Sequence, residues 1–200
     1  MNPAASAATA VTPIEAVRFA VVDVETSGLS TRRHHVLQVA VVGVNGSGAE
    51  LDRWSSLVRP RIRWWFRLGP RHIHGLTRAA LRAAPPARSV MAELTRRLEG
   101  STFTAHNVGF DAAFLQRLAR RSGVTLTLGP QLCTLRLSRR LDPERQLSHR
   151  LADVTARYGI TNGRPHDALG DAVATAGVLP HLLRAHGVIN ADQLSQFTSS

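Results

Sequence analysis

The 200-residue sequence has a single cysteine, Cys133, no lysine and no long apolar run. One cysteine excludes an internal disulfide framework and a zinc site built from several cysteines, and it fits a reducing compartment. No stretch approaches the roughly 18 consecutive apolar residues that a membrane span needs. The first sixteen residues also lack the basic start and the apolar block of a signal peptide. We therefore expect a cytoplasmic protein that makes no use of a membrane, with a flexible N-terminal tail over residues 1–16.

Acidic residues are scarce as well. Only 14 Asp and Glu residues stand against 25 basic residues, all of them Arg, which gives a formal net charge of +11. A domain this basic is typical of proteins that meet a polyanion, with nucleic acid first and an acidic membrane surface second. The hydrophobic fraction of 44% excludes a disordered chain, and the length suits one compact domain.

The order of the hydrophobic segments predicts a mixed α/β domain. Apolar runs at 17–24 and 36–44, an Asn-Gly turn signal after the second run and a third candidate strand at 50–58 predict an antiparallel meander. A helix capped by Ser89 is expected at 89–98, followed by a short strand at 102–105. Further helices, each followed by glycine, are expected at 111–121, 148–158 and 167–185. Pro180 should kink or divide the last helix, and the chain from Asn190 reads as an appendage.

Carboxylates recur in three short clusters. Asp23 and Glu25 are two residues apart on a predicted strand, so their side chains leave the same face. Asp111 falls in the first turn of a predicted helix, where an acid also simply favours the helix dipole. Asp167 and Asp171 are four residues apart and share one helical face. Each cluster alone has a structural explanation, as a strand end, a helix cap or a solvated surface.

The combination of clusters indicates metal chemistry. Carboxylate oxygens are hard ligands that suit Mg²⁺ or Mn²⁺ rather than zinc. In a two-metal site, one ion activates water and the other stabilises the leaving oxygen of a phosphoryl displacement. His166, at the entrance to the last predicted helix, could take the proton from that water, although it is one of nine histidines.

The residues of these three clusters resemble the motifs of the DEDDh family of 3′-to-5′ exonucleases. That family includes the DnaQ-like proofreading subunits and ribonuclease T. The three motifs of that family resemble Asp23–Leu29, Ala105–Asp111 and His166–Asp171, and an intervening element resembles His74–Thr77. The resemblance covers about residues 17 to 186. It implies a ribonuclease H-like fold, a mixed central sheet with helices on both faces. The exonuclease domain would span 17–188 and a C-terminal tail 189–200.

The resemblance also implies residue roles. Two Mg²⁺ or Mn²⁺ ions would be held by the four carboxylates of Asp23, Glu25, Asp111 and Asp171. His166 would be the general base, and Asp167 is the nearest competitor to Asp171. Contacts to the substrate, including the terminal 3′ hydroxyl, the last base and the approaching phosphates, would come from Thr26, Leu29, His106, Asn107 and Phe110.

Two further segments bear on partners. Trp64, Trp65 and Phe66, interleaved with arginines, are either a platform on which bases stack or rings that fill the core beneath their loop. Gln193–Phe197 is similar to the short peptides by which bacterial replication proteins dock on the sliding clamp, except that Gln196 replaces an aliphatic residue. The alternative for this segment is a frayed chain end.

The sequence therefore predicts a metal-dependent 3′-to-5′ exonuclease that acts on single-stranded ends, with DNA proofreading or repair as the expected context. A DNA polymerase or sliding clamp is a candidate partner. Trimming of RNA 3′ ends is the alternative within this class. An inactive nucleic-acid-binding module is the alternative outside it, but such a module has no use for four converging acids. A phosphatase of small nucleotides would explain the acids but not the charge of +11.

Overall fold

The computed structural model describes residues 11–60, 68–69, 75–161 and 167–199. Six strands form one mixed sheet in the order β3-β2-β1-β4-β5-β6. Their bounds are β1 (Arg18–Thr26), β2 (Val36–Asn45), β3 (Glu50–Leu57), β4 (Thr102–Ala105), β5 (Gln131–Cys133) and β6 (Thr198–Ser199). The first three strands pair as the predicted antiparallel meander, while β4 runs parallel to β1 and β5 runs parallel to β4.

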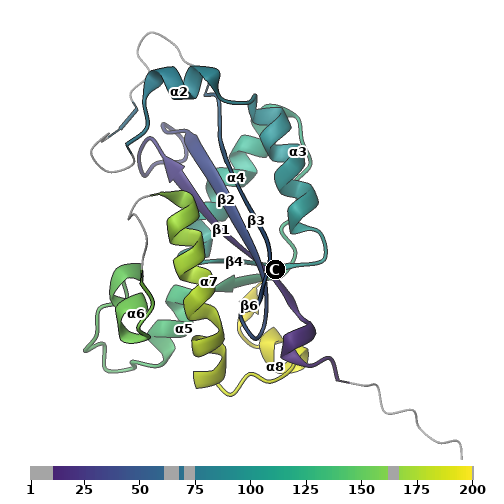
Figure 1. Ribbon diagram of the computed structural model, residues 1–200, viewed down its shortest axis with the longest axis vertical. Helices are drawn as coiled ribbons and strands as arrows, with labels where there is room; N and C mark the ends of the chain where they lie inside the picture. The colour runs from purple at the N-terminus through teal and green to yellow at the C-terminus, as the bar shows by residue number, and fades with distance from the viewer. Residues whose placement is uncertain (1–10, 61–67, 70–74, 162–166, 200) are drawn as a thin grey trace, which may run out of the picture.

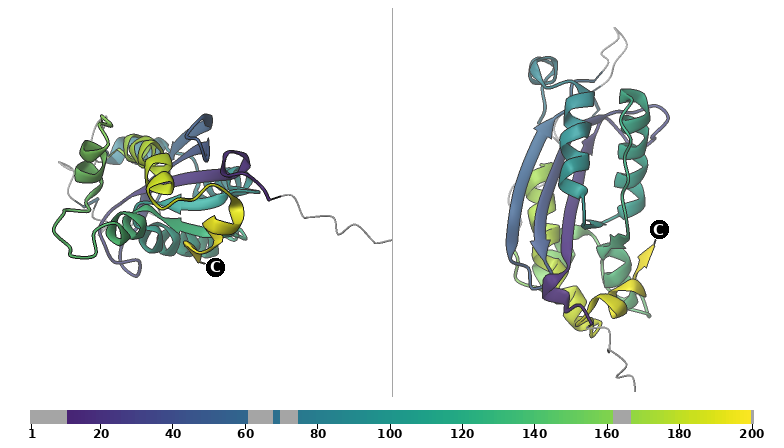
Figure 2. Two further views of the ribbon diagram at one scale, coloured as in Figure 1. Left: turned by 90° about the horizontal axis from the view of Figure 1, so that it is seen from below. Right: turned by 90° about the vertical axis from the view of Figure 1, so that its right-hand side faces the viewer.

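Helices cover both faces of this sheet (Figures 1 and 2). One face packs against α3 (Ala87–Leu98) and α4 (Val108–Ser122), and the other packs chiefly against α7 (Ala168–Ala185). The shorter elements are η1 (Ile14–Ala16), α2 (Arg78–Ala83), α5 (Thr134–Arg140), α6 (Leu151–Arg157) and α8 (Ala191–Ser195). The predicted fold class is confirmed.

Side chains of β1 alternate between the two halves of the core, as the period of a strand requires. Ala20 and Val22 belong to the cluster under α3 and α4, whereas Phe19 and Val21 belong to the cluster under α7. All four side chains are at most 2% exposed, so β1 is buried on both faces. The same alternation places every second residue after Val21 on the face toward α7.

Several details differ from the sequence-based expectations, among them the following. Helix α3 begins two residues early, at Ala87 behind Pro86, so Ser89 does not cap it. Helix α7 continues through Pro180 as one element, although proline removes one backbone hydrogen-bond donor. Strand β5 was not predicted, because three residues are too few to show a period.

Among the described helices, none is both long and apolar enough to cross a membrane.

The last described residues complete the domain instead of forming an appendage. The Asn190 side chain accepts a hydrogen bond from the backbone of Gln193 and so caps α8. Strand β6 pairs with β5 and extends the sheet. Leu194 is 4% exposed in the core under α7, and the Phe197 ring lies 4.9 Å from that of His186. The apolar side chains of the predicted clamp peptide thus pack inside the domain, which weighs against docking through this segment.

Candidate active site

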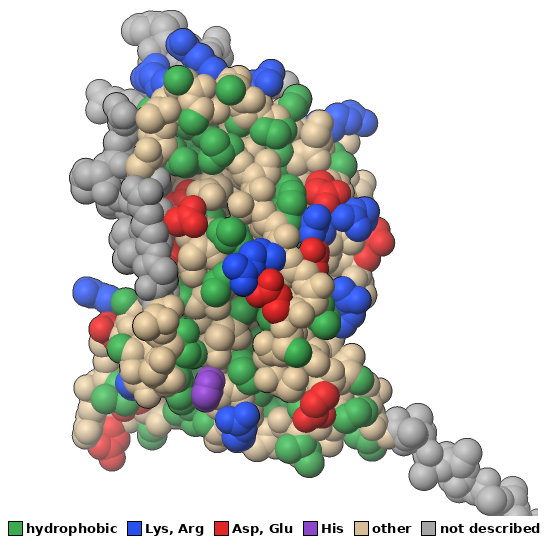
Figure 3. All heavy atoms as spheres, in the orientation of Figure 1, with side chains coloured by type: hydrophobic (Ala, Val, Ile, Leu, Met, Phe, Trp, Pro, Cys, Tyr) green, Lys and Arg blue, Asp and Glu red, His purple; other side chains and the backbone are tan. Residues whose placement is uncertain are grey.

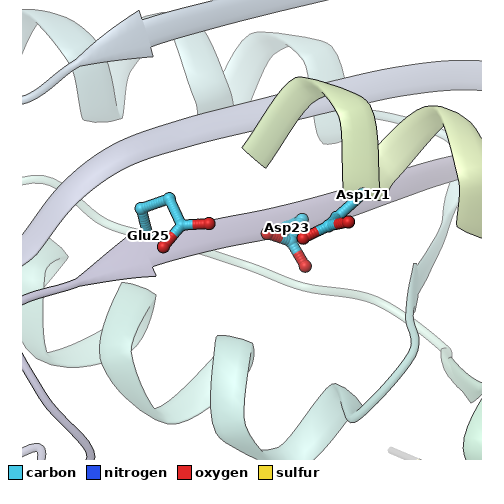
Figure 4. Close-up of side chains that lie close together, drawn as sticks. All are labelled: Asp23, Glu25 and Asp171. Carbon is cyan, nitrogen blue, oxygen red and sulfur yellow. The ribbon is translucent and has the colours of Figure 1, made fainter. Parts of the chain in front are cut away.

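Three carboxylates converge where β1 passes the beginning of α7. Asp23 and Glu25 follow Val21 on the face of β1 toward α7, and Asp171 comes from the first turn of that helix. Oxygen atoms of the three side chains lie within 4.8 Å of one another. Figure 4 shows Asp171 beside Asp23, with the Glu25 carboxylate on the same strand turned toward them. The cluster therefore joins the first and third sequence motifs.

The beginning of α7 is fixed by Asp167. Its Oδ2 accepts a hydrogen bond of 3.2 Å from the backbone N–H of Gly170, which caps the helix, and its Oδ1 accepts one of 3.0 Å from Gln38 Nε2. Gln38 lies opposite Glu25 in the β1–β2 register. Asp167 is thus engaged in capping, while Asp171, one turn later, joins the cluster. The sequence analysis did not identify Gln38 as part of the site. The only signal in the sequence is that Gln38 is polar within the apolar run of β2.

Asp111 reaches the same region from the other side of β1. Pairing between β1 and β4 covers only Phe19–Val21, so the following part of β1 has an open edge toward the first turn of α4. Asp111 is 5% exposed there. Burial raises its pKa to about 8, although hydrogen bonds from its own backbone and from that of Val24 act in the opposite direction. The short length of β4 is what allows this approach.

The carboxylates oppose one another's ionisation. Burial, followed by the charges of Asp111 and Asp171, raises the pKa of Asp23 well above its ordinary value. Burial and the charges of Asp171 and Asp167 raise the pKa of Glu25 to about 7. A divalent cation reverses this effect, because it stabilises the ionised form of each ligand. An all-oxygen set of carboxylates, three half-buried and one buried, fits Mg²⁺ or Mn²⁺.

The residues predicted to contact the substrate differ in how exposed their side chains are. Leu29 is 84% exposed, on the loop that follows β1. Asn107 is exposed at the N-terminus of α4, and Phe110 is half-buried with its ring 4.8 Å from that of Phe114. The Thr26 hydroxyl donates a hydrogen bond of 2.9 Å to the carbonyl of Gly28. Leu29, Asn107 and Phe110 are therefore accessible to a ligand.

Other predicted residues lie outside the described part of the chain. These are the proposed base His166, His74 of the intervening element, and the aromatic residues Trp64, Trp65 and Phe66.

His106 makes contacts within the protein at both ring nitrogens. Its Nε2 lies 2.9 Å from the carbonyl oxygen of His149, and its Nδ1 lies 3.0 Å from Thr134 Oγ1. Since a carbonyl only accepts, Nε2 carries the hydrogen and Nδ1 accepts from the Thr134 hydroxyl. Burial lowers the pKa of this imidazole, which favours the neutral form. The ring thereby ties the loop before α4 to the start of α5.

Solved structures with the same architecture include nucleases. Exonuclease I of E. coli, in complex with a dT13 oligonucleotide, superimposes with a TM-score of 0.72 at 19% identity, over 84% of this chain and 41% of that chain. The nuclease domain of 3′hExo, a DEDDh family member bound to rAMP, superimposes with a TM-score of 0.72 at 16% identity, over 87% of this chain and 96% of that one. The fold is ribonuclease H-like.

Sequence comparison then defines the family. The exonuclease family model RNase_T matches residues 20–179. The DNA polymerase III subunit epsilon-like protein of Rhodobacter capsulatus is 35% identical over 182 residues, which are 89% of this chain and 25% of that protein. This chain thus spans about a quarter of that relative's length. The chain belongs to the exonuclease family and is DnaQ-like, as the resemblance predicted.

Proposed function

We propose that this domain removes nucleotides from the 3′ end of single-stranded nucleic acid, with DNA as its preferred substrate and two divalent metal ions as cofactors. The observation that carries the proposal is the meeting of Asp23, Glu25 and Asp171 within 4.8 Å, with buried Asp111 adjoining them across β1. Burial and the neighbouring carboxylates raise the pKa of Asp23 and Glu25, and burial raises that of Asp111, so this cluster is unfavourable for stability unless cations bind it. A site of this kind is built for a cation and for the phosphates that accompany it.

Mg²⁺ or Mn²⁺ ions held by Asp23, Glu25, Asp111 and Asp171 would supply activation of water and stabilisation of the leaving oxygen. The protein's own residues would position the strand. Leu29 offers an exposed apolar contact for a terminal base, and Asn107 and Phe110 flank the strand at the first turn of α4. His166 directly precedes the capping Asp167 in the sequence, and the family resemblance supports it as the general base.

The choice of DNA rests on the similarity to an epsilon-like polymerase III protein, which also makes a DNA polymerase the favoured partner. RNA is the second candidate substrate, because the similar nuclease domain of 3′hExo was solved with rAMP. The single, buried Cys133 is consistent with the cytoplasm as the place of action.

The proposal is tested with single-stranded DNA and RNA of one sequence, labelled at the 5′ end, in Mg²⁺, Mn²⁺ or EDTA. We expect a ladder that shortens from the 3′ end, forms faster on DNA, and disappears in EDTA and in Asp23→Asn. Asp192→Asn, an exposed acid on α8, is the matched control and should leave the ladder intact. Binding of both strands without a ladder in any metal would refute catalysis and leave a nucleic-acid-binding module.

A further inference from the structure

Five arginines lie on two segments that are distant in the sequence, the loop that follows β1 and the helix that carries Asp111. Arg32 and Arg33 lie on the loop between β1 and β2, and Arg117, Arg120 and Arg121 lie on the second half of α4. Arg117 Nη2 donates a hydrogen bond of 3.0 Å to the carbonyl of Arg32, which fastens the loop to the helix. Figure 2 (right) shows this loop reaching across to α4. We call this set the arginine ridge.

The ridge continues a stripe that begins at the candidate active site. Phe110, Arg117 and Arg121 are separated by seven and four residues, so they share one face of α4, whereas Phe114 between them is buried in the core. Phe110 adjoins Asp111 in the sequence. At 1.5 Å per residue, Arg117 lies about 10 Å and Arg121 about 16 Å along the helix from Phe110. A ligand that extends from the carboxylates over α4 in this direction therefore meets the arginines.

The charge of the ridge has no acidic counterpart in its own segments. Residues 26–49 and 112–141 contain no Asp or Glu. On the face shown in Figure 3, by contrast, acids and arginines alternate over β3 and α3, in pairs such as Arg53–Glu50 and Arg96–Glu93. Arg32, Arg33, Arg120 and Arg121 are exposed, and Arg117 is half-buried. The ridge is thus an exposed positive surface.

The loop that carries Arg32 and Arg33 is held in one shape. The Ser27 backbone N–H donates a hydrogen bond of 2.9 Å to the His35 carbonyl. In return, the His35 backbone N–H donates one of 3.0 Å to Ser27 Oγ. Gly28 has a φ of +152°, and a Cβ there would lie 2.6 Å from the His34 ring. A surface fixed before binding loses less conformational entropy when a ligand arrives.

We infer that the arginine ridge binds the phosphate backbone of nucleic acid whose 3′ end occupies the candidate active site. This inference rests on the proposed function. At 3.4 Å per stacked nucleotide, the distances along α4 place the contacts about three to five nucleotides from the 3′ end. Arginine is suited to this role because its planar guanidinium donates two parallel hydrogen bonds to phosphate. The phosphates belong either to the strand being degraded or to a strand paired with it.

The test compares Arg120→Gln/Arg121→Gln with Arg18→Gln/Arg184→Gln. The control pair removes the same charge from the first residue of β1 and the last turn of α7, and all four arginines are exposed. Fluorescence anisotropy in EDTA measures binding of 3-nucleotide and 12-nucleotide single strands without cleavage. For the ridge pair we expect roughly 10- to 30-fold weaker binding of the 12-nucleotide strand at about 0.1 M salt, as two lost phosphate contacts predict. The control should change it less than about threefold.

Two further readouts identify the source of the phosphates. If the ridge holds the degraded strand, the salt dependence of the 12-nucleotide complex falls by a slope of about 1.4, while the 3-nucleotide strand binds as to the wild type. If it holds a paired strand, only a duplex with a single-stranded 3′ end loses affinity. The inference is overturned if the ridge pair binds both the 12-nucleotide strand and the duplex like the wild type, or if the control pair weakens binding equally.

Failure of the ridge and failure of the proposed function are distinguishable. The binding measurement needs neither metal nor turnover. If the wild type forms the ladder and the Arg120→Gln/Arg121→Gln variant binds like the wild type, only the inference about the arginine ridge is refuted. Ridge-dependent binding without a ladder in any metal removes only the exonuclease activity.

Discussion

Replacing Glu25 by Gln should stabilise the metal-free protein, because it removes a charge from a cluster that disfavours charge. The pKa of Glu25 is raised from 4.5 to about 7. That difference corresponds to about 3 kcal/mol, which solvent screening of this half-buried group reduces to about 2 kcal/mol. For a domain of this size we expect the Tm in EDTA at pH 8 to rise by about 4 to 8 °C.

The sign of the pH dependence follows from the direction of the shift. The folded state holds the Glu25 proton more tightly than the unfolded chain, so the wild type loses stability as pH rises from about 4.5 to 7. Below that window the carboxyl is protonated in both states. The Tm gain of Glu25→Gln should therefore be large at pH 8 and nearly absent at pH 4.5.

Thermal unfolding in EDTA and in Mn²⁺ at the two pH values measures this effect. Mn²⁺ should raise the Tm of the wild type at pH 8 and raise that of Glu25→Gln much less, since one ligand is gone. Glu15→Gln, at an exposed position on η1, is the matched control and should shift the Tm little in any condition. An equal gain at both pH values, or no gain at pH 8, would refute the electrostatic account of the cluster.

Three further predictions test individual residues. Asp171→Asn should abolish cleavage with the far-UV circular dichroism spectrum unchanged, whereas Asp167→Ala should lower stability by about 1 kcal/mol through loss of the α7 cap while cleavage persists; the reverse pattern would exchange their roles. His166→Ala should slow single-turnover hydrolysis by about 10² to 10⁴ fold, and a near-wild-type rate would remove it as general base. Leu194→Ala should destabilise the domain by about 2 to 5 kcal/mol in urea unfolding, because Leu194 is buried; a change under about 0.5 kcal/mol would restore the frayed end inferred from the sequence.

Local patterns predicted several features of the fold and site correctly. The apolar runs and the Asn-Gly turn predicted the meander of β1, β2 and β3. The two-residue period placed Asp23 and Glu25 on one face, where they lie together. These features depend on residues close together in the chain, whose geometry is set by the backbone itself.

Other features depend on where separate elements end. Asp111 approaches Asp23 only because β4 is shorter than β1 and pairs with Phe19–Val21 alone, and the sequence predicted the strand but not this pairing. Asp167 and Asp171 are the same residue type at the start of one helix, so the sequence pattern does not show which of them joins the carboxylate cluster. The contact of Asp167 with Gln38 on β2 distinguishes them. The burial of Leu194 likewise depends on contacts with α7 that no local period reports.

The sequence by itself determined the longer strands and helices, the shared face of Asp23 and Glu25, and the family motifs, because these follow from backbone periodicity and residue chemistry along the chain. Only the tertiary structure decided which acids meet, how the C-terminal segment packs, and that Arg32 lies against Arg117. The contact between Arg32 and Arg117, for example, joins residues separated by 85 positions. The geometry of such contacts is set by the packing of the whole sheet and its helices, which a local pattern does not contain.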